Sequence, residues 1–463
     1  MANLMQKLPT DYKVVLEKIT PLQFPRGNRK PLYIWRLMEN LETLENVEIK
    51  TVLEMMDERG IACSVSWRPE NKEQVLENCL RYSKIQQSLG LEVNVNANSC
   101  MYTFFNGDES TFHVDNQGNR FYDDSFGGQK MGCPFALKGR YEAIKKQLEY
   151  YLQAYKQANI DINFIFGDWE IDGPIEWNNA WLNSKKCTHC RENIKNIDDF
   201  TSFQTSLRKI RSDMQKKVFS DTAKKYYPNI LSGNYGVYPC DGYRYWYDYF
   251  ENPIEENIPH QTEQNAIYRQ WYNEFEETGY TIAMPVIYTW YNTFKYYDFE
   301  NTDYRWFYNM LKVASNAAEN TPSQIPIVSF VHWSTTAPPA NPDPEVKPLS
   351  EKMYEEILWH CLLRGHDSFF MWCIQSELID EIRPLHKVYS QSLEYNDFIT
   401  KGTPVTFDVP NNADVVISGL ELGSKILVRR TDFGDSKRTV HFAFDGKEFE
   451  IPYADGKFFI LEK

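Results

Sequence analysis

The sequence predicts a (β/α)₈ barrel followed by a small C-terminal antiparallel β domain. Short apolar runs alternate with amphipathic helical segments from about residue 31 to residue 395, which is the pattern of parallel βαβ units. Eight such runs are present, and eight parallel strands close a barrel. Beyond residue 395, single apolar and polar residues alternate and tight-turn dipeptides separate the runs, which indicates antiparallel strands.

The first hundred residues repeat one strand and one helix with a period of about 30 residues. Gly60 and Gly90 stand where each of the two helices should end, as C-terminal caps. The predicted segments are a strand over 31–35, a helix over 47–59, a strand over 61–67, a helix from about residue 72 and a strand over 91–97.

The alternation continues with longer connections. Predicted helices cover 138–158, 200–226, 264–278, 304–318 and 351–363, and they lead to strands over 162–168, 230–235, 280–288, 325–332 and 368–372. A helix over 378–393 follows the last strand. An open doubly wound sheet is the alternative, but no glycine-rich nucleotide loop follows the first strand to support it.

We assign residues 1–395 to the barrel, with long loops after strands three, four and five, and residues 396–463 to the all-β domain. In the latter, Val405, Phe407 and Val409 alternate with other residues, and Asp445-Gly446 and Asp455-Gly456 are tight-turn signals. Such a domain most often packs on the barrel, and nothing in its sequence specifically indicates that it binds carbohydrate itself.

Composition narrows the classes of partner. The net charge of −14 disfavours nucleic acid and anionic membranes, and no apolar run reaches the roughly 18 residues of a membrane span. Nine scattered cysteines favour reduced thiols over a disulfide framework. No signal peptide is evident, so a cytoplasmic location is expected for the chain as it stands, or a secreted or periplasmic one if a leader was removed. The oligomeric state is open.

The end of the fourth predicted strand carries three carboxylates, Asp168, Glu170 and Asp172, before a Gly-Pro turn. Side chains two apart in a strand share a face. Asp168 and Glu170 are therefore expected on the face of the preceding apolar side chains, which are Ile162, Phe164 and Phe166. Packing alone does not call for carboxylates there, because burying them costs desolvation energy. This arrangement indicates an acid/base pair at the carboxyl end of a barrel, although Asp172 is equally placed to cap the turn.

Barrel enzymes place their chemistry at the carboxyl ends of the strands. The other candidate substrate-binding residues at these ends are Arg36, Trp67, Arg68, Asn98, Tyr235, Tyr288, Trp290, His332, Trp333 and Trp372. Aromatic walls around carboxylates suit glycoside chemistry, although packing alone also explains many rings. The two arginines either pair with the strand-four acids or bind an anionic sugar.

The triplet Asp168-Trp169-Glu170 resembles the end of the strand-four signature of glycoside hydrolase family 18, the chitinase-type barrels, which reads Asp-x-x-Asp-x-Asp-x-Glu. The resemblance implies that Glu170 is the general acid and that Asp168 orients a substrate acetamido group that acts as nucleophile. It further implies that Tyr288 holds this acetamide and that Trp372 forms the floor of the sugar site. Only the last three residues match, because Asn163 and Phe166 stand where the signature has its first two acids.

The sequence thus predicts a glycoside hydrolase of oligo- or polysaccharides, with Glu170 as general acid and Asp168 as its partner. The predicted tips of strands six to eight carry no carboxylate, so the nucleophile is unidentified. In one alternative, Asp241 or Asp248 of the strand-five loop supplies the second carboxylate for an inverting or double-displacement mechanism. In another, the barrel binds carbohydrate without cleaving it.

No cofactor and no metal are predicted. Cys187-Thr-His-Cys190 has zinc-like spacing, but a closed site needs four ligands, and no second pair stands at a matching interval, although Cys240 or His189 could assist. The run Asp115-Asn-Gln-Gly-Asn119 resembles part of a calcium loop, yet it lacks the later acidic ligand.

Overall fold

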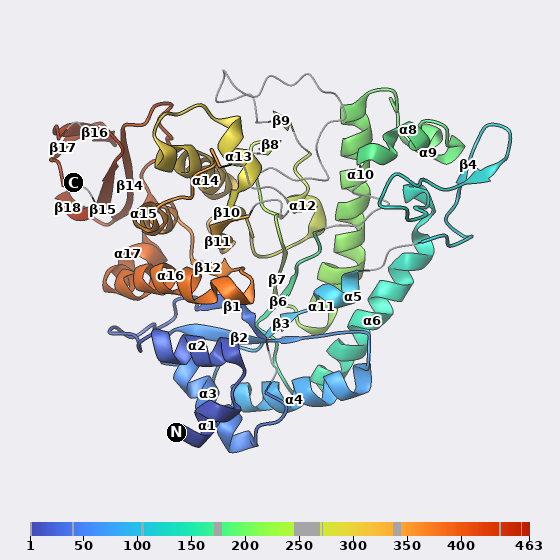
Figure 1. Cartoon of the computed structure of the whole chain (residues 1–463), viewed down its shortest axis with the longest axis horizontal. Coiled ribbons are helices and arrows are strands. Elements are labelled where there is room, and N and C mark those ends of the chain that lie inside the picture. The colour runs from blue at the N-terminus through green and yellow to red at the C-terminus, as the bar shows by residue number, and fades with distance from the viewer. Residues whose placement is uncertain are drawn as a thin grey trace.

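The eight predicted strands form one parallel sheet at the centre of the molecule (Figure 1). The computed structural model describes residues 2–38, 41–102, 106–170, 178–244, 269–270, 272–336, 344–434, 437–454 and 456–463. The sheet order is β10-β11-β12-β1-β2-β3-β6-β7. Its strands are β1 (Leu32–Met38), β2 (Ile61–Ser66), β3 (Asn94–Asn96), β6 (Phe164–Gly167), β7 (Leu231–Asn234), β10 (Val286–Trp290), β11 (Val328–Thr336) and β12 (Ser368–Met371).

Backbone hydrogen bonds close this sheet between its two end strands, β7 and β10. The segment 281–284 precedes β10 and lies beside β7. The Thr281 N–H donates to the Ser232 carbonyl at 2.9 Å, and the Gly236 N–H donates to the Met284 carbonyl at 3.0 Å. On its other side, Ala283 forms a parallel bridge with Ile327. The sixth predicted strand therefore begins in this segment, and the predicted (β/α)₈ barrel is confirmed.

The predicted helices surround the barrel with small shifts at their ends. They are α3 (Asn46–Asp57), α4 (Lys72–Ser88), α6 (Lys138–Gln157), α10 (Phe200–Met214), α11 (Asp221–Tyr226), α14 (Thr302–Asn320), α15 (Glu351–Leu362) and α16 (Leu378–Ser392). A π-helical segment, η3 (Gln215–Ser220), joins α10 to α11. Of the helix predicted over 264–278, the described residues include α12 (Phe275–Thr278). None of the described helices has the length and apolarity needed to cross a membrane.

The barrel interior is filled by aromatic rings. Phe370 lies 4.7 Å from both Phe166 and Phe330, measured between ring centroids. Phe164 and Phe166 point inward, whereas Ile165 between them belongs to the core between sheet and helices, as the alternation of a strand requires. Ile162 precedes β6 and also packs toward the helices, so it does not share the inward face that the sequence assigns to it.

The C-terminal strands form antiparallel sheets beside α15, at the left of Figure 1. They are β13 (Thr403–Pro404), β14 (Val415–Leu422), β15 (Lys425–Asp432), β16 (Val440–Phe444), β17 (Lys447–Ile451) and β18 (Lys457–Glu462). Asp445 and Gly446 join β16 to β17 with φ angles of 51° and 72°, as a type I′ hairpin turn requires. The run over 405–409 is not a strand. Buried Arg429 of β15 binds Glu356 of α15 at 2.6 Å, which ties this sheet to the helix layer.

Candidate functional site

The acid-bearing end of β6 is held in place through Trp169. The Asn234 side chain at the end of β7 binds this residue twice, accepting its N–H at 2.9 Å and donating to its carbonyl at 3.1 Å. Arg211 of α10 donates to the same carbonyl at 2.8 Å. Gly167 leaves room for the amide, because a Cβ there would lie 2.8 Å from Asn234 Oδ1. Residues of β7 and α10 therefore fix the backbone of Trp169, just after the end of β6.

The chain makes a tight turn at Trp169, which presents Asp168 and Glu170 together. The Glu170 N–H donates to the Asp168 carbonyl at 3.0 Å, which is the bond of a three-residue turn. The Trp169 ring, 1% exposed, packs into the core between sheet and helices. With the ring directed outward at the corner of the turn, the two acids lie on the side of the barrel interior.

Electrostatic coupling shows that these acids share their surroundings with Tyr288. Burial raises the pKa of Asp168 well above its usual range, and the neighbouring charge of Glu170 raises it further. Burial likewise raises the pKa of Tyr288, and the charges of Asp168, Glu170 and Glu381 add to this effect. Three carboxylates therefore raise the pKa of one phenol hydroxyl on β10.

Rings on or directly after the barrel strands β7, β10, β11 and β12 surround Tyr288, and together with it they form what we call the aromatic frame. Measured between ring centroids, Tyr288 lies 6.1 Å from Tyr235, 6.3 Å from Trp290, 5.5 Å from His332 and 6.2 Å from Trp372. Trp290 and Trp372 are partly exposed, whereas Tyr235, Tyr288 and His332 are buried. The structure thus brings seven of the sequence-predicted site residues together, namely Asp168, Glu170, Tyr235, Tyr288, Trp290, His332 and Trp372.

Two further carboxylates, neither of which is among the site residues predicted from the sequence, lie beside this frame. Glu377 ends a short 3₁₀ helix after β12, and its side chain is 26% exposed. His332 Nε2 lies 3.2 Å from Glu377 Oε2, and the Ile374 N–H donates to the same oxygen at 3.2 Å. Burial by itself raises the pKa of Glu377, but the hydrogen bonds with His332 and Ile374 outweigh burial, so the pKa is lowered overall.

Glu381 stands one helical turn further along α16 and is fully buried. Its carboxylate accepts the Trp333 N–H at 2.9 Å and the Ser334 N–H at 2.5 Å, and it lies 3.4 Å from His332 Nε2. Burial raises its pKa despite these contacts. The spacing of four residues, which places Glu377 and Glu381 on one face of a helix, was the signal available in the sequence.

Arg36 and Trp67 point away from the barrel interior, which corrects their predicted position. Arg36 binds Asp11 of α2 (Thr10–Lys18) at 2.9 Å. The fully buried Trp67 stacks on Tyr151 of α6 at 5.1 Å. Successive side chains of a strand point to opposite faces of the sheet. In both strands the preceding side chain is on the inner face, so Arg36 and Trp67 point outward to the helices.

Arg68, Trp333 and Asn98 are also placed outside the aromatic frame. Arg68 is exposed, and its carbonyl accepts the Tyr151 hydroxyl. Trp333 stacks on Tyr354 at 5.8 Å, toward α15. Asn98 begins α5 (Asn98–Met101), and its N–H donates to Asn96 Oδ1 at 2.9 Å.

Of the alternative carboxylates in the strand-five loop, Asp241 is described. It accepts the Asn316 amide of α14 at 2.8 Å, and its own N–H donates back to Asn316 Oδ1 at 3.1 Å. This anchors Asp241 to the helix layer. Asp248 of the same loop and the predicted site residue Asp172 lie outside the described residues.

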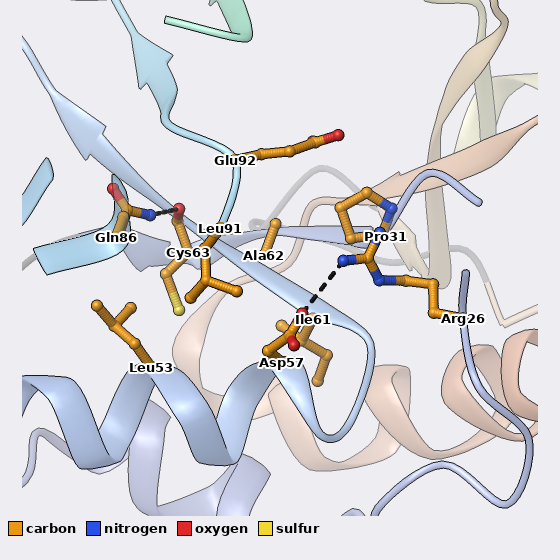
Figure 2. Close-up of a pocket in the computed structure, with 10 residues that line it drawn as sticks. All are labelled: Arg26, Pro31, Leu53, Asp57, Ile61, Ala62, Cys63, Gln86, Leu91 and Glu92. Atoms are coloured by element: carbon orange, nitrogen blue, oxygen red, sulfur yellow. Dashed lines mark hydrogen bonds and ion pairs between the residues drawn. The ribbon is translucent and has the colours of Figure 1, made fainter. Parts of the chain in front are cut away.

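A small pocket lies at the opposite end of the barrel, where β1 and β2 begin (Figure 2). It has about 20 Å³ of water-accessible space, which is room for about one water molecule. Arg26 and Asp57 close one side with an ion pair at 3.2 Å. Its place at the amino ends of the strands and its size argue against a substrate site.

The chain matches no family model and no curated protein. The similar solved structures include the α-L-fucosidase isoenzyme 2 from Paenibacillus thiaminolyticus (10% identity, TM-score 0.43, 82% of this chain and 51% of that chain). They also include the GH36 α-galactosidase AgaA from Geobacillus stearothermophilus (11%, 0.46, 97% and 57%) and the isomaltulose synthase from Klebsiella sp. LX3 (9%, 0.46, 94% and 98%). The chain spans about half the length of the first two. These likenesses are too remote to carry an activity to this chain.

Proposed function

We propose that this chain is a glycoside hydrolase acting on an oligo- or polysaccharide. One observation carries the proposal: Asp168 and Glu170 share the carboxyl end of the barrel with Glu377 and the aromatic frame. Carboxylates of opposite protonation around a sugar-sized set of rings are what acetal hydrolysis requires. A barrel places such groups at this end of its strands.

Asp168 and Glu170 form the proton-donating side. Two neighbouring carboxylates do not both ionise readily, so the pair holds one proton to a higher pH than a single carboxylate would. The raised pKa of Asp168 supports this protonated pair. Glu170 is the general acid toward the leaving group, and Asp168 is the partner that keeps the proton on the pair near neutral pH.

Glu377 is the ionised carboxylate of the proposed mechanism. Its lowered pKa keeps it a carboxylate at neutral pH, as a nucleophile or a general base must be. Glu377 takes the role of second carboxylate, for which the sequence offers Asp241 or Asp248. A carboxylate separation of about 5 Å from Glu170 predicts retention of configuration, and about 6.5–9.5 Å predicts inversion.

The aromatic frame supplies the surface for the sugar ring. Trp290 and Trp372 are its partly exposed members, and indole faces stack on the apolar faces of sugars. In the acetamide-assisted mechanism that the resemblance implies, Tyr288 and Trp372 also contact the sugar. That mechanism requires an N-acetylated sugar. Because Asp11 already neutralises Arg36, the proposal requires no anionic sugar.

Hydrolysis assays on a panel of oligosaccharides and aryl glycosides test the proposal. Glu170→Gln should lower turnover at least about 100-fold while leaving thermal unfolding unchanged. Glu92→Gln is the matched control, since Glu92 lies beside the pocket at the opposite end of the barrel, and it should keep wild-type turnover.

Near-normal turnover of the Glu170→Gln variant would remove the assignment of this residue. Glycan binding without product release by the wild-type protein would replace the hydrolase with a carbohydrate-binding barrel. If N-acetylhexosaminides are inert while other glycans are cleaved, the acetamide-assisted version is wrong and a carboxylate acts as the nucleophile or base.

A further inference from the structure

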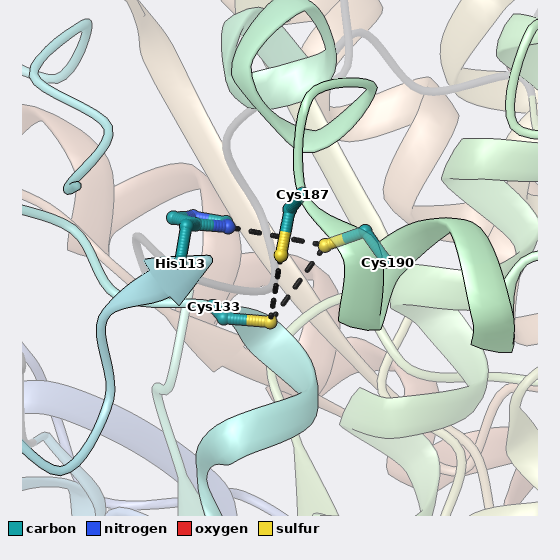
Figure 3. A group of neighbouring side chains, drawn as sticks. All are labelled: His113, Cys133, Cys187 and Cys190. Carbon is teal, nitrogen blue, oxygen red and sulfur yellow. Dashed lines mark hydrogen bonds between the residues drawn. The ribbon is translucent and has the colours of Figure 1, made fainter. Parts of the chain in front are cut away.

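Three cysteines and one histidine converge on the flank of the barrel, and we call them the cysteine cluster: His113, Cys133, Cys187 and Cys190 (Figure 3). The Sγ atom of Cys133 lies 3.7 Å from that of Cys190 and 3.9 Å from that of Cys187. Cys190 Sγ lies 3.9 Å from His113 Nδ1. All four ligand atoms lie within 4.8 Å of one another.

These distances fit the edges of a zinc tetrahedron. With Zn–S bonds of about 2.3 Å and Zn–N bonds of about 2.0–2.1 Å, the edges of a tetrahedron are about 3.8 Å between sulfurs and about 3.5 Å between sulfur and nitrogen. A disulfide needs a much shorter separation of about 2.05 Å, and all three cysteines are free thiols. The side chains are thus spaced for a shared ion.

Separate short elements deliver the four ligands. Cys187 is the N-cap of α9 (Thr188–Asn193) and Cys190 lies in its first turn. Cys133 precedes the 3₁₀ segment η1 (Pro134–Ala136), and His113 lies on β4 (His113–Val114). The Thr188 hydroxyl donates to the Val114 carbonyl at 3.1 Å, which ties α9 to β4. The two loops that follow β3 and β6 therefore meet at this point.

Burial argues that the cluster has more than a packing role. Each of the four side chains is at most 1% exposed. The His113 ring is stacked on Phe121 at 5.1 Å, and a small apolar core that includes Trp181 and Phe203 surrounds the thiols. An imidazole and three thiols in one dry space have weak hydrogen bonds to offer one another, whereas a zinc ion would satisfy all four.

We propose that the cysteine cluster is a structural zinc site of the Cys₃His type. Four protein ligands close the coordination shell, which leaves no open position for catalysis. The ion holds together two long connections that have only a small core of their own. The sequence predicts no metal and offers only Cys240 or His189 as further ligands beside Cys187 and Cys190. In the structure His113 and Cys133 complete the set, and His189 is exposed on α9.

Metal analysis of the intact purified protein tests the proposal. Elemental analysis should find about one zinc ion per chain. Replacing it with Co²⁺ should give the intense visible bands of tetrahedral cobalt and a sulfur-to-cobalt charge-transfer band. Cys133→Ser and Cys190→Ser should each lower the zinc content at least about tenfold.

Matched controls separate the ligands from their neighbours. His189→Ala removes the imidazole on the same helix, and Cys100→Ser alters a buried thiol outside the cluster. Both variants should keep the full zinc content. If the serine variants do not fold, the cobalt spectrum of the wild-type protein decides on its own.

Two results would overturn the proposal. One is an intact, zinc-supplemented protein that contains no stoichiometric metal. The other is a mass spectrum that shows a disulfide between two of these three cysteines in the freshly purified protein.

Discussion

The cysteine cluster and the group formed by His332, Glu377 and Glu381, which we call the carboxylate cluster, look alike by residue type and differ in what else their atoms bind. In both, the potential ligand atoms lie within 4.8 Å of one another. The thiols of Cys133 and Cys190 have each other as close polar partners. Glu381, in contrast, already accepts backbone N–H groups from Trp333 and Ser334.

The difference teaches that proximity of ligand types does not by itself make a metal site. Buried polar groups must form hydrogen bonds. The carboxylates of the carboxylate cluster form theirs with main-chain N–H groups and with His332. The cysteine cluster has only weak donors and acceptors of its own. In our proposals, a metal ion completes the cysteine cluster, whereas the carboxylate cluster needs no ion and faces the sugar.

Removal of zinc should produce the largest effect. Structural zinc contributes about 10–16 kcal/mol in small zinc-binding peptides, far more than a hydrogen bond. Treatment with a strong chelator should abolish hydrogen-exchange protection in 187–193 and around Cys133, while the barrel strands keep theirs. Hydrogen exchange followed by mass spectrometry measures this. His332→Ala should bind zinc as the wild-type protein does, and a zinc content that falls in this variant would break the comparison.

Glu377→Gln should affect turnover and spare stability. Loss of the ionised carboxylate should reduce turnover about 10²- to 10⁴-fold, whereas the partly exposed side chain contributes little to folding. Steady-state kinetics and urea unfolding measure the two quantities. Because hydrogen bonds lower the pKa of Glu377, the acid limb of the wild-type pH–rate profile should lie below the usual glutamate pKa. An unchanged rate would return the second carboxylate to the strand-five loop.

Glu381→Gln should affect stability more than turnover. The amide oxygen can replace Oε1, which accepts the N–H groups of Trp333 and Ser334, but the NH₂ group then replaces Oε2, which also accepts the Trp333 N–H at 2.9 Å. A donor would then face a donor, and the free energy of unfolding should fall by about 1–3 kcal/mol. Urea unfolding measures the change. Glu355→Gln is the matched control, because its ion pair with Lys387 lies near the surface and contributes only about 0–1 kcal/mol. Equal stability of the two variants would show that the buried carboxylate does not hold β11 to α16.

The two clusters also show how far sequence reasoning reaches. All eight barrel strands were predicted, because an apolar run between helical segments is a local pattern. The cysteine cluster was missed because Cys133 stands 54 residues before Cys187 and His113 stands 77 residues before Cys190. Only the three-dimensional path of two long loops brings them together.

Within the candidate site, the predicted residues that lie beside the acids are those whose side chains point to the inner face of the barrel. Tyr288 and Trp372 lie in the frame around the barrel axis, and Arg36 and Trp67 point toward helices. The strand-end residues that the sequence suggests lie on both faces of the sheet, and their position at a strand end does not separate the two faces. The sequence prediction does not indicate Glu377, because this residue directly precedes the helix predicted over 378–393 and does not stand at the tip of a predicted strand.

Asp168→Asn should change how the free energy of unfolding depends on pH, and the sign of this change is specific. Because burial and the charge of Glu170 raise the pKa of Asp168, the folded protein holds this proton to a higher pH than the unfolded chain does. Above the unfolded aspartate pKa of about 4, stability is therefore lost as the pH rises toward the folded pKa. The asparagine variant lacks this loss, so its free energy of unfolding relative to wild type should increase with pH over this window. Urea unfolding at a series of pH values measures the difference. Parallel curves would show that Asp168 ionises normally, and the proton that our mechanism places on the Asp168–Glu170 pair would have to come from elsewhere.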